Sequence, residues 1–494
     1  MIDQFSTLLN LIDFLPELIL IIALIMVLIL DLFEENSIWI FRISLMALSV
    51  ASLILVSQWI APVSNTFFEN YTLNGITIIF RCLIALSATF SILISEEYIR
   101  SSGMAVSEFL IFVLTATIGA FFISGANDLI TLFVAIECLS LASYLLAGYS
   151  KLDIRSNEAS MKYLLMGGAS SAILAYGFSW LYGLSGGKLV FSDIFLALSK
   201  IHSAESPLAL SLICILVAIF FKLSIVPFHQ WAPDVYEGAP TPVVAFFSVT
   251  AKAAGFILAI RILTLVFPVH TQLIWQPIFG TLSILTMIVG NVIALTQTNI
   301  KRLLAYSSIS QVGYLSIAIL YGESLGYTPL VLHILTYIFA NIGAFACVIL
   351  LGLKTGTDQL RDYNGLYFRD PMMTICLTIC LLSLAGLPPF AGFFSKIYIF
   401  WSAWNQGFYA LVYAGLITSV ISIYYYLRII KTMITKEHQE ESKYIRLYKT
   451  GATKSIGNTT LELAIGICMA LSSTLGFFFD PLIEITTNTL LIKL

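Results

Sequence analysis

Four charged side chains lie inside apolar stretches of the sequence, where a charge is energetically costly. They are Glu137 in TLFVAIECLSLASYLL, Lys222 in IFFKLSIVP, Lys252 in FFSVTAKAAGFIL and Lys396 in GFFSKIYIFW. A charge at the centre of a membrane helix costs about 2.5 to 3.5 kcal/mol on insertion scales, so each one needs a partner or water. Because removal from water disfavours the ammonium form, a buried lysine can release its proton and act as a proton carrier. These residues therefore predict proton transfer.

A static role is the alternative for these charges. Glu137 could form a buried ion pair with one lysine and so fix the packing of two helices. Three lysines and one acid cannot all be neutralised in this way, which favours proton transfer. His333, in LVLHILTYIFANIGAF, could pass protons between the two halves of the chain or serve as a hydrogen-bonded core residue, and the sequence leaves both roles open.

Lys222 lies next to an expected break in its helix. Pro227 has no backbone N–H, so we expect the carbonyl of Leu223 to lose its helical partner. At membrane depth such a group is tolerated only where protein or water satisfies it. A charge and a helix break together predict a polar cavity inside the membrane.

Other polar residues are interpreted as structural. Asp234 and Glu237 follow the break and are expected to brace the loop there. A polar helix face in KRLLAYSSISQVGY is interpreted as a source of interhelix hydrogen bonds rather than a water site. It consists of Ser307, Ser308, Ser310 and Gln311. Glu17 lies in the first turn of the first apolar helix, where an acid caps the helix favourably.

The composition is that of an integral membrane protein in contact with the lipid bilayer. Of the 494 residues, 59% are hydrophobic and 11% are charged, and the mean hydropathy is +0.94. Soluble proteins carry about 25% charged residues. The net charge of −3 and the lack of a basic stripe argue against a nucleic-acid partner. The seven cysteines and five histidines form no metal-binding or redox pattern, so no cofactor is expected on this chain.

The elements that position these residues are apolar helices. At about 20 residues per span, the sequence predicts an all-α polytopic membrane protein with about fourteen transmembrane helices. Proline-broken helices at Pro227 and at Pro388-Pro389 run in opposite directions, as two inverted repeats require. The first apolar run lacks a cleavage pattern and is expected to be retained as a span. We expect one membrane domain, 1–494, with N-terminal helices at 1–106, a first repeat at 107–266, a second repeat at 274–431 and a C-terminal helix at 460–494.

The distribution of basic residues predicts the orientation. Most of the 25 lysines and arginines fall at one set of span ends if the N-terminus faces the outer, positive side of the membrane. By the positive-inside rule, these ends face inward. An even number of spans then places both termini outside.

Four segments carry a resemblance to a known family. Residues 155–187, 221–256, 301–314 and 384–396 resemble the antiporter-like membrane subunits of respiratory complex I. Within that family the chain is similar to subunit N, and most closely to its counterparts in the plastid and cyanobacterial NADH-dehydrogenase-like complex. The resemblance covers nearly the whole chain.

The resemblance implies proton translocation through two linked half-channels. Quinone reduction elsewhere in an NAD(P)H- or ferredoxin-quinone (plastoquinone) oxidoreductase would drive it, so this chain would be an enzyme subunit without redox chemistry of its own. Quinone and iron–sulfur clusters would lie on other subunits, and the partners would be other membrane-arm subunits. The proton-carrying residues of the family fall on Glu137, Lys222, Lys252 and Lys396.

Two rival functions remain beside this one. One is a subunit of a multisubunit cation/proton antiporter, since that family shares the broken helices and buried charges. The other is a structural anchor whose charges hold neighbouring subunits. The resemblance implies a chloroplast thylakoid membrane, with a cyanobacterial or a mitochondrial inner membrane as the alternatives.

Overall fold

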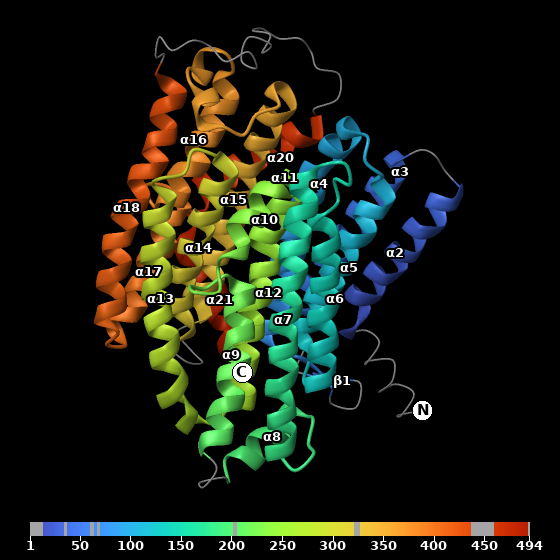
Figure 1. The fold of residues 1–494 in the computed structure, drawn as a ribbon, viewed down its shortest axis with the longest axis vertical. Coiled ribbons are helices and arrows are strands. Elements are labelled where there is room, and N and C mark those ends of the chain that lie inside the picture. Colours follow the sequence, from blue (N-terminus) through green and yellow to red (C-terminus); the bar gives the residue numbers. More distant parts are fainter. Residues whose placement is uncertain are drawn as a thin grey trace.

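Long helices packed side by side make up the structure, a computed structural model (Figure 1). Helices α2 and α3 lie at one edge of the bundle and α18 lies at the opposite edge. The structure describes residues 13–33, 37–59, 64–66, 70–200, 205–320, 327–435 and 459–492.

Eleven helices of the described chain are long and apolar enough to cross a membrane, or up to twelve if a bent pair is one span. The pair is α20 (Thr459–Thr474) with α21 (Phe479–Ile492), bent by 90°. One span is composite: α11 (Thr241–Phe246), the π-helix η1 (Phe247–Ala251), α12 (Lys252–Arg261) and the π-helix η2 (Ile262–Val266). The others are α2 (Leu15–Phe33), α3 (Ser37–Gln58), α4 (Gly75–Ser102), α5 (Val106–Gly125), α6 (Leu129–Ala147), α7 (Ile154–Leu184), α9 (Glu205–Leu223), α13 (Gln272–Ala294), α15 (Tyr327–Thr355) and α18 (Tyr409–Ile434).

The expected count of about fourteen spans is not confirmed by length and composition. Helix α14 (Ile300–Ile319) has two basic residues in its first turn and carries several hydroxyl side chains, so it is less apolar than the others. Helices α16 (Pro371–Ala385) and α17 (Ala391–Asn405) have 15 residues each, because the proline break divides them. The all-helical membrane architecture is confirmed.

Short elements complete the described chain. An antiparallel hairpin of two strands packs its second strand into the bundle, where all three residues are buried. The short elements are β1 (Ser64–Thr66), β2 (Tyr71–Leu73), α8 (Phe191–Leu198), α10 (Trp231–Gly238), η3 (Val269–Thr271), η4 (Leu360–Tyr363) and η5 (Leu366–Phe368).

The first helix break begins earlier than the proline predicts. Helix α9 ends at Leu223, and Ser224 adopts a left-handed φ of 60°. The N–H of Ile225 then donates to the carbonyl of Phe220 at 2.8 Å, which closes the helix end in a Schellman motif. Pro227 follows, and because it cannot donate a hydrogen bond it prevents the helix from resuming at once.

The second break closes in the same way. Gly386 takes a left-handed φ of 79° after the last residue of α16. The N–H of Leu387 donates to the carbonyl of Leu382 at 3.2 Å. Helix α9 starts near α8 at the lower end of the bundle, whereas α16 lies at the upper end (Figure 1). The two broken helices expected from the sequence are therefore present.

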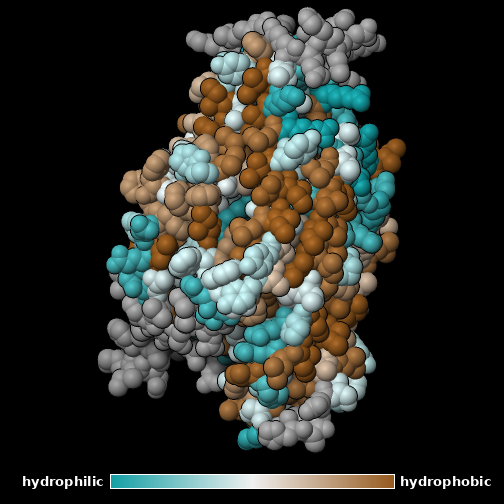
Figure 2. Space-filling view, turned by 90° about the vertical axis from the view of Figure 1, so that its left-hand side faces the viewer, coloured by the Kyte–Doolittle hydropathy of each residue, from teal (hydrophilic) through white to brown (hydrophobic). Residues whose placement is uncertain are grey.

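The helices at the centre of the bundle are more completely enclosed by protein than those at its edges. In the 18-residue apolar stretch of each span, 94% of the residues are buried for the composite span 241–266 and for α15, against 28% for α2 and 39% for α18. Lys252 and His333 are carried by these two central helices. Apolar side chains cover much of the lateral face in Figure 2, as a surface in contact with lipid requires. The molecule is an integral membrane protein with several spans.

Candidate functional site

Glu137 and Lys222 lie in one site without forming an ion pair. The Lys222 ammonium donates to the hydroxyl of Ser140 on α6, one helical turn beyond Glu137. The two charges are near enough to interact electrostatically. Among the described residues no salt bridge joins them, and Oε1 of Glu137 is buried without a hydrogen-bond partner. The structure thus places the two side chains in one site, but no direct hydrogen bond or ion pair joins Glu137 to Lys222.

The backbone of α6 positions Glu137. The carboxylate of Asp128 accepts the N–H groups of Ile130 at 3.0 Å and Thr131 at 2.9 Å. This N-cap satisfies two amide groups that the first turn leaves without partners. Asp128 therefore fixes the residue at which α6 begins, and Glu137 lies about two turns further along the helix.

Lys252 is held by a backbone carbonyl. It follows directly after the π-helix η1, a wider turn that often occurs at functional sites. Its Nζ donates to the carbonyl of Ser308 on α14 at 2.8 Å, and the residue is 4% exposed. No carboxylate of the described chain lies within salt-bridge distance of this ammonium.

Lys396 is held by the end of the broken helix. Its Nζ donates to the carbonyls of Leu384 at 2.8 Å and Ala385 at 3.1 Å, the last two residues of α16. Carbonyls at a helix C-terminus have no helical partners and carry the negative end of the helix dipole. A cation is therefore stabilised there. The break creates this place for Lys396, which comes from α17 on the far side of the same break.

His333 connects α14 to the neighbourhood of Lys396. Its Nδ1 lies 2.9 Å from the hydroxyl of Ser395, and its Nε2 lies 3.1 Å from Oε1 of Gln311. The amide nitrogen of Gln311 donates to Leu384 at 3.1 Å, so its oxygen is left to accept from Nε2–H of the imidazole. A neutral imidazole protonated at Nε2 fits this arrangement.

A small cavity lies among these groups. It measures about 10 Å³ and is lined by Gln311, His333, Ser383 and Lys396 among others. This is about the space that one water molecule occupies. A proton can pass between polar groups through such a water, because water both accepts and donates hydrogen bonds.

Helix α14 lies between the lysine of one half and that of the other. It binds Lys252 through the carbonyl of Ser308, and it binds His333 through Gln311, about one turn further along. The carbonyl of Leu384 accepts from both Gln311 and Lys396. The five predicted residues thus form two groups, Glu137 with Lys222 and Lys252 with His333 and Lys396.

The polar face of α14 differs in part from the prediction. Gln311 does make interhelix hydrogen bonds. The hydroxyls of Ser307, Ser308 and Ser310 instead donate to carbonyls of their own helix at 2.7 to 2.8 Å. This back-bonding is the usual choice for a serine inside a helix, because the carbonyl one turn earlier is always within reach.

Four charged residues, the rim cluster, hold α10 between two helices. Lys162 of α7 contacts Asp234 at 2.9 Å, and Arg302 of α14 contacts Glu237 at 2.7 Å and Asp234 at 3.4 Å. Partly exposed pairs of this kind contribute up to about 1 kcal/mol each. The bracing role expected for Asp234 and Glu237 is what this geometry provides.

A buried ion pair was missed by the sequence reasoning. Glu17 of α2 and Arg81 of α4 meet at 2.7 Å, and both side chains are fully buried. The Tyr71 hydroxyl also donates to Glu17 at 2.8 Å. Glu17 lies in the first turn of α2 as expected, and its carboxylate in addition binds Arg81. The depth of Arg81, nearly two turns inside α4, was the available indication.

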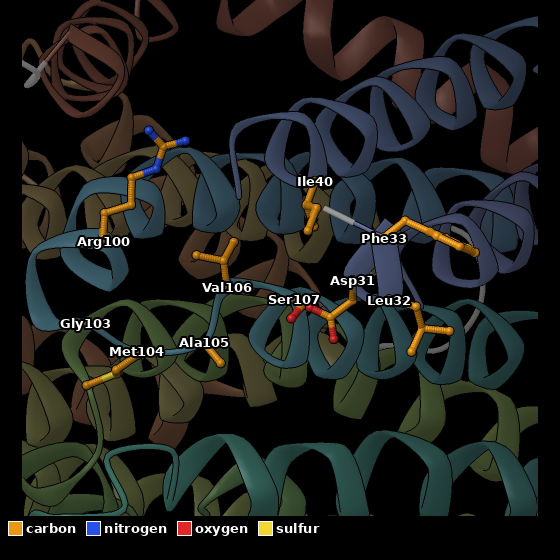
Figure 3. A pocket seen from close by; sticks show the side chains of 10 residues that line it. All are labelled: Asp31, Leu32, Phe33, Ile40, Arg100, Gly103, Met104, Ala105, Val106 and Ser107. Atoms are coloured by element: carbon orange, nitrogen blue, oxygen red, sulfur yellow. The ribbon is translucent and has the colours of Figure 1, made fainter. Parts of the chain in front are cut away.

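A further cavity lies away from these groups. It has a volume of about 710 Å³, and its lining includes Asp31, Arg100 and Ser107 at the ends of α2, α4 and α5 (Figure 3). None of the five predicted residues lines it. Lys252 and Lys396 are instead almost fully buried in protein, which suits proton transfer.

The chain is similar to membrane subunits of known complexes. Residues 126–422 match the family described as "NADH:quinone oxidoreductase/Mrp antiporter, TM". The chloroplastic NAD(P)H-quinone oxidoreductase subunit 2 of Zygnema circumcarinatum is 55% identical over 479 residues, 97% of this chain and 96% of the relative.

Solved structures give the same likeness. A chain of respiratory complex I from Thermus thermophilus superposes with a TM-score of 0.76 at 30% identity, over 94% of this chain and 98% of that one. A chain of the Mrp complex from Dietzia has a TM-score of 0.81 at 18% identity, over 96% of each chain, which shows a common fold alone.

Proposed function

The chain belongs to the family of NADH:quinone oxidoreductase and Mrp antiporter membrane subunits, and on that premise we propose that it translocates protons as a membrane-arm subunit of an NAD(P)H-quinone oxidoreductase complex. Its relative in Zygnema circumcarinatum bears that name, and the chain covers nearly the whole of it. Quinone reduction on other subunits supplies the free energy.

One observation carries the proposal. Lys252 and Lys396 are almost fully buried and are held by carbonyl oxygens, not by carboxylates. An ammonium that loses its proton here becomes a neutral amine, which still donates hydrogen bonds to the same carbonyls. Both protonation states therefore fit the site, as a proton carrier requires.

The two groups of residues give two stretches of a proton route. A proton on Lys222 lies beside Ser140 and the charge of Glu137. From Lys252 the polar groups of α14 and His333 lead to Lys396. His333 can move a proton between its Gln311 side and its Ser395 side, because one ring nitrogen of an imidazole accepts a proton while the other releases one. Glu137 keeps Lys222 charged while it is near, so a change in their separation moves the proton onward.

The assembly follows from the relatives. Quinone, plastoquinone in a chloroplast, and iron–sulfur clusters belong to other subunits in this proposal, and the neighbours of this chain are other membrane-arm subunits. The chloroplastic relatives support a chloroplast membrane, and we propose that it is the thylakoid membrane.

Proton uptake by vesicles containing the intact complex tests the proposal. Lys396→Ala should abolish most uptake per quinone reduced while the complex still assembles, because a proton-carrying group is lost at the end of the route. Arg302→Ala, which removes a rim-cluster charge, is the matched control and should retain most uptake.

Two results would overturn the proposal. Undiminished uptake by Lys396→Ala would remove this lysine from the route. Uptake that continues without quinone reduction but requires a sodium gradient would instead identify a cation/proton antiporter subunit.

A further inference from the structure

We propose that Tyr314 is a positioning residue for Lys396, whose ring face holds the ammonium against the end of α16 and favours its protonated state. The inference rests on the proposed function, in which Lys396 carries protons. It adds a residue from α14 whose role neither hydropathy nor charge indicates.

The ammonium of Lys396 faces the Tyr314 ring. Nζ lies 5.2 Å from the ring centroid, within the range of a cation–π interaction. Tyr314 is fully buried and Lys396 is 4% exposed. Such interactions are strongest where water is excluded. The ammonium is therefore enclosed by two carbonyls of α16 on one side and by an aromatic face on another.

The tyrosine ring is itself held in place. Its hydroxyl donates to Thr418 of α18 at 3.3 Å and accepts from the amide of Asn291 of α13 at 3.2 Å. The oxygen of Asn291 accepts from the hydroxyl of Tyr425 at 3.1 Å. Phe400, one turn beyond the lysine, meets the Tyr314 ring edge-to-face at 6.0 Å. Three helices thus orient the ring toward the ammonium.

Each neighbouring helix contributes different groups. His333 and Tyr337 of α15 line the small cavity next to the Lys396 ammonium. Helix α16 contributes carbonyl oxygens, and its Cys380 lies instead against Gly343, as does Cys468 of α20. From α18, Tyr425 is linked to the Tyr314 hydroxyl through Asn291, and Tyr426 lies near Tyr314 and Gln311. Among the described residues, Tyr314 is therefore the one whose ring face lies against this ammonium.

The pH profile of proton uptake distinguishes this role from simple packing. In vesicles with the intact complex, Tyr314→Leu removes the ring face, so Lys396 loses its proton at lower pH. The alkaline limb of the profile should move down by about one pH unit. Tyr314→Phe keeps the ring face, so its alkaline limb should stay close to the parental position. Tyr363→Leu, which removes a buried tyrosine ring before α16 begins, is the matched control and should leave the limb in place.

The outcomes separate this inference from the proposed function. Equal shifts in Tyr314→Leu and Tyr314→Phe, or a parental profile in Tyr314→Leu, would overturn the positioning role. If Lys396→Ala stops uptake while Tyr314→Leu keeps the parental profile, only this inference fails. If Lys396→Ala pumps normally, the proposed function of Lys396 fails and this inference with it.

Discussion

A lysine bound to a carbonyl oxygen gives up its proton under different conditions from one bound to a carboxylate. When an ion pair loses the lysine proton, it leaves a buried negative charge without compensation. Lys252 and Lys396 leave only neutral groups behind, because their acceptors are carbonyls. Lys222 is intermediate, since it donates to Ser140 and lies near the charge of Glu137. Each lysine thus holds its proton by a different set of groups.

Substitution of Lys222 tests whether release of the proton matters at this position. Lys222→Arg keeps the charge, but a guanidinium hardly ever deprotonates, so we expect loss of most proton uptake. Lys222→Ala should lose a similar share while assembly is little affected. Uptake per assembled complex is the measurement. Parental uptake in Lys222→Arg would show that a fixed positive charge is sufficient.

A broken helix exposes backbone carbonyls inside the bundle, and these can bind a cation. The Schellman closures at Ser224 and Gly386 end α9 and α16 inside the bundle. At the second break the freed carbonyls of α16 receive Lys396. Gly386 also leaves room for that side chain, because a Cβ there would lie 2.9 Å from Cδ of the lysine. The element therefore positions the chemistry through its backbone.

Gly386→Ala tests this arrangement. The added methyl group should displace Lys396 from the α16 carbonyls, and a left-handed alanine costs about 1 to 2 kcal/mol. We expect a marked loss of proton uptake per assembled complex. Gly356→Ala is the matched control, because its φ is +74° and no atom lies within 4 Å of its added Cβ. Equal losses in both variants would attribute the effect to backbone strain alone.

At the scale of the whole molecule, the N-terminal helices are joined to the bundle by a buried ion pair. Glu17 and Arg81 lie on α2 and α4, and the Arg81 guanidinium also lies over the ring of Tyr71 at 4.8 Å. Removing one member of such a pair leaves an uncompensated buried charge. This pair is separate from the five predicted residues, so it should affect assembly more than transport.

Arg81→Met should reduce the amount of assembled complex, because breaking a buried pair costs about 3 to 5 kcal/mol. Adding Glu17→Gln should restore much of the loss by removing the orphaned charge. The measurements are complex abundance and uptake per complex, and the latter should not change. Lys151→Met is the control, since its pair with Glu108 is exposed and contributes about 1 kcal/mol or less. If Arg81→Met lowers uptake per complex, the pair takes part in transport.

The buried lysines could be predicted because hydropathy alone shows a charge in an apolar run. Their partners could not. The acceptors of Lys252 and Lys396 are backbone carbonyls, which every residue has and no letter of the sequence distinguishes. Arg81 lies nearly two turns inside α4, but its partner Glu17 is on α2, and no sequence pattern shows that these two helices place the side chains together. Tyr314 resembles any core aromatic residue until α13, α14 and α18 are packed together.

The use of backbone acceptors has a consequence for inheritance. A codon change at Ser308, Leu384 or Ala385 replaces a side chain but leaves the carbonyl oxygen in the peptide. Drift at these three positions therefore does not by itself delete a ligand of either lysine. Substitutions at these positions can therefore accumulate while the acceptor oxygens of Lys252 and Lys396 stay in place.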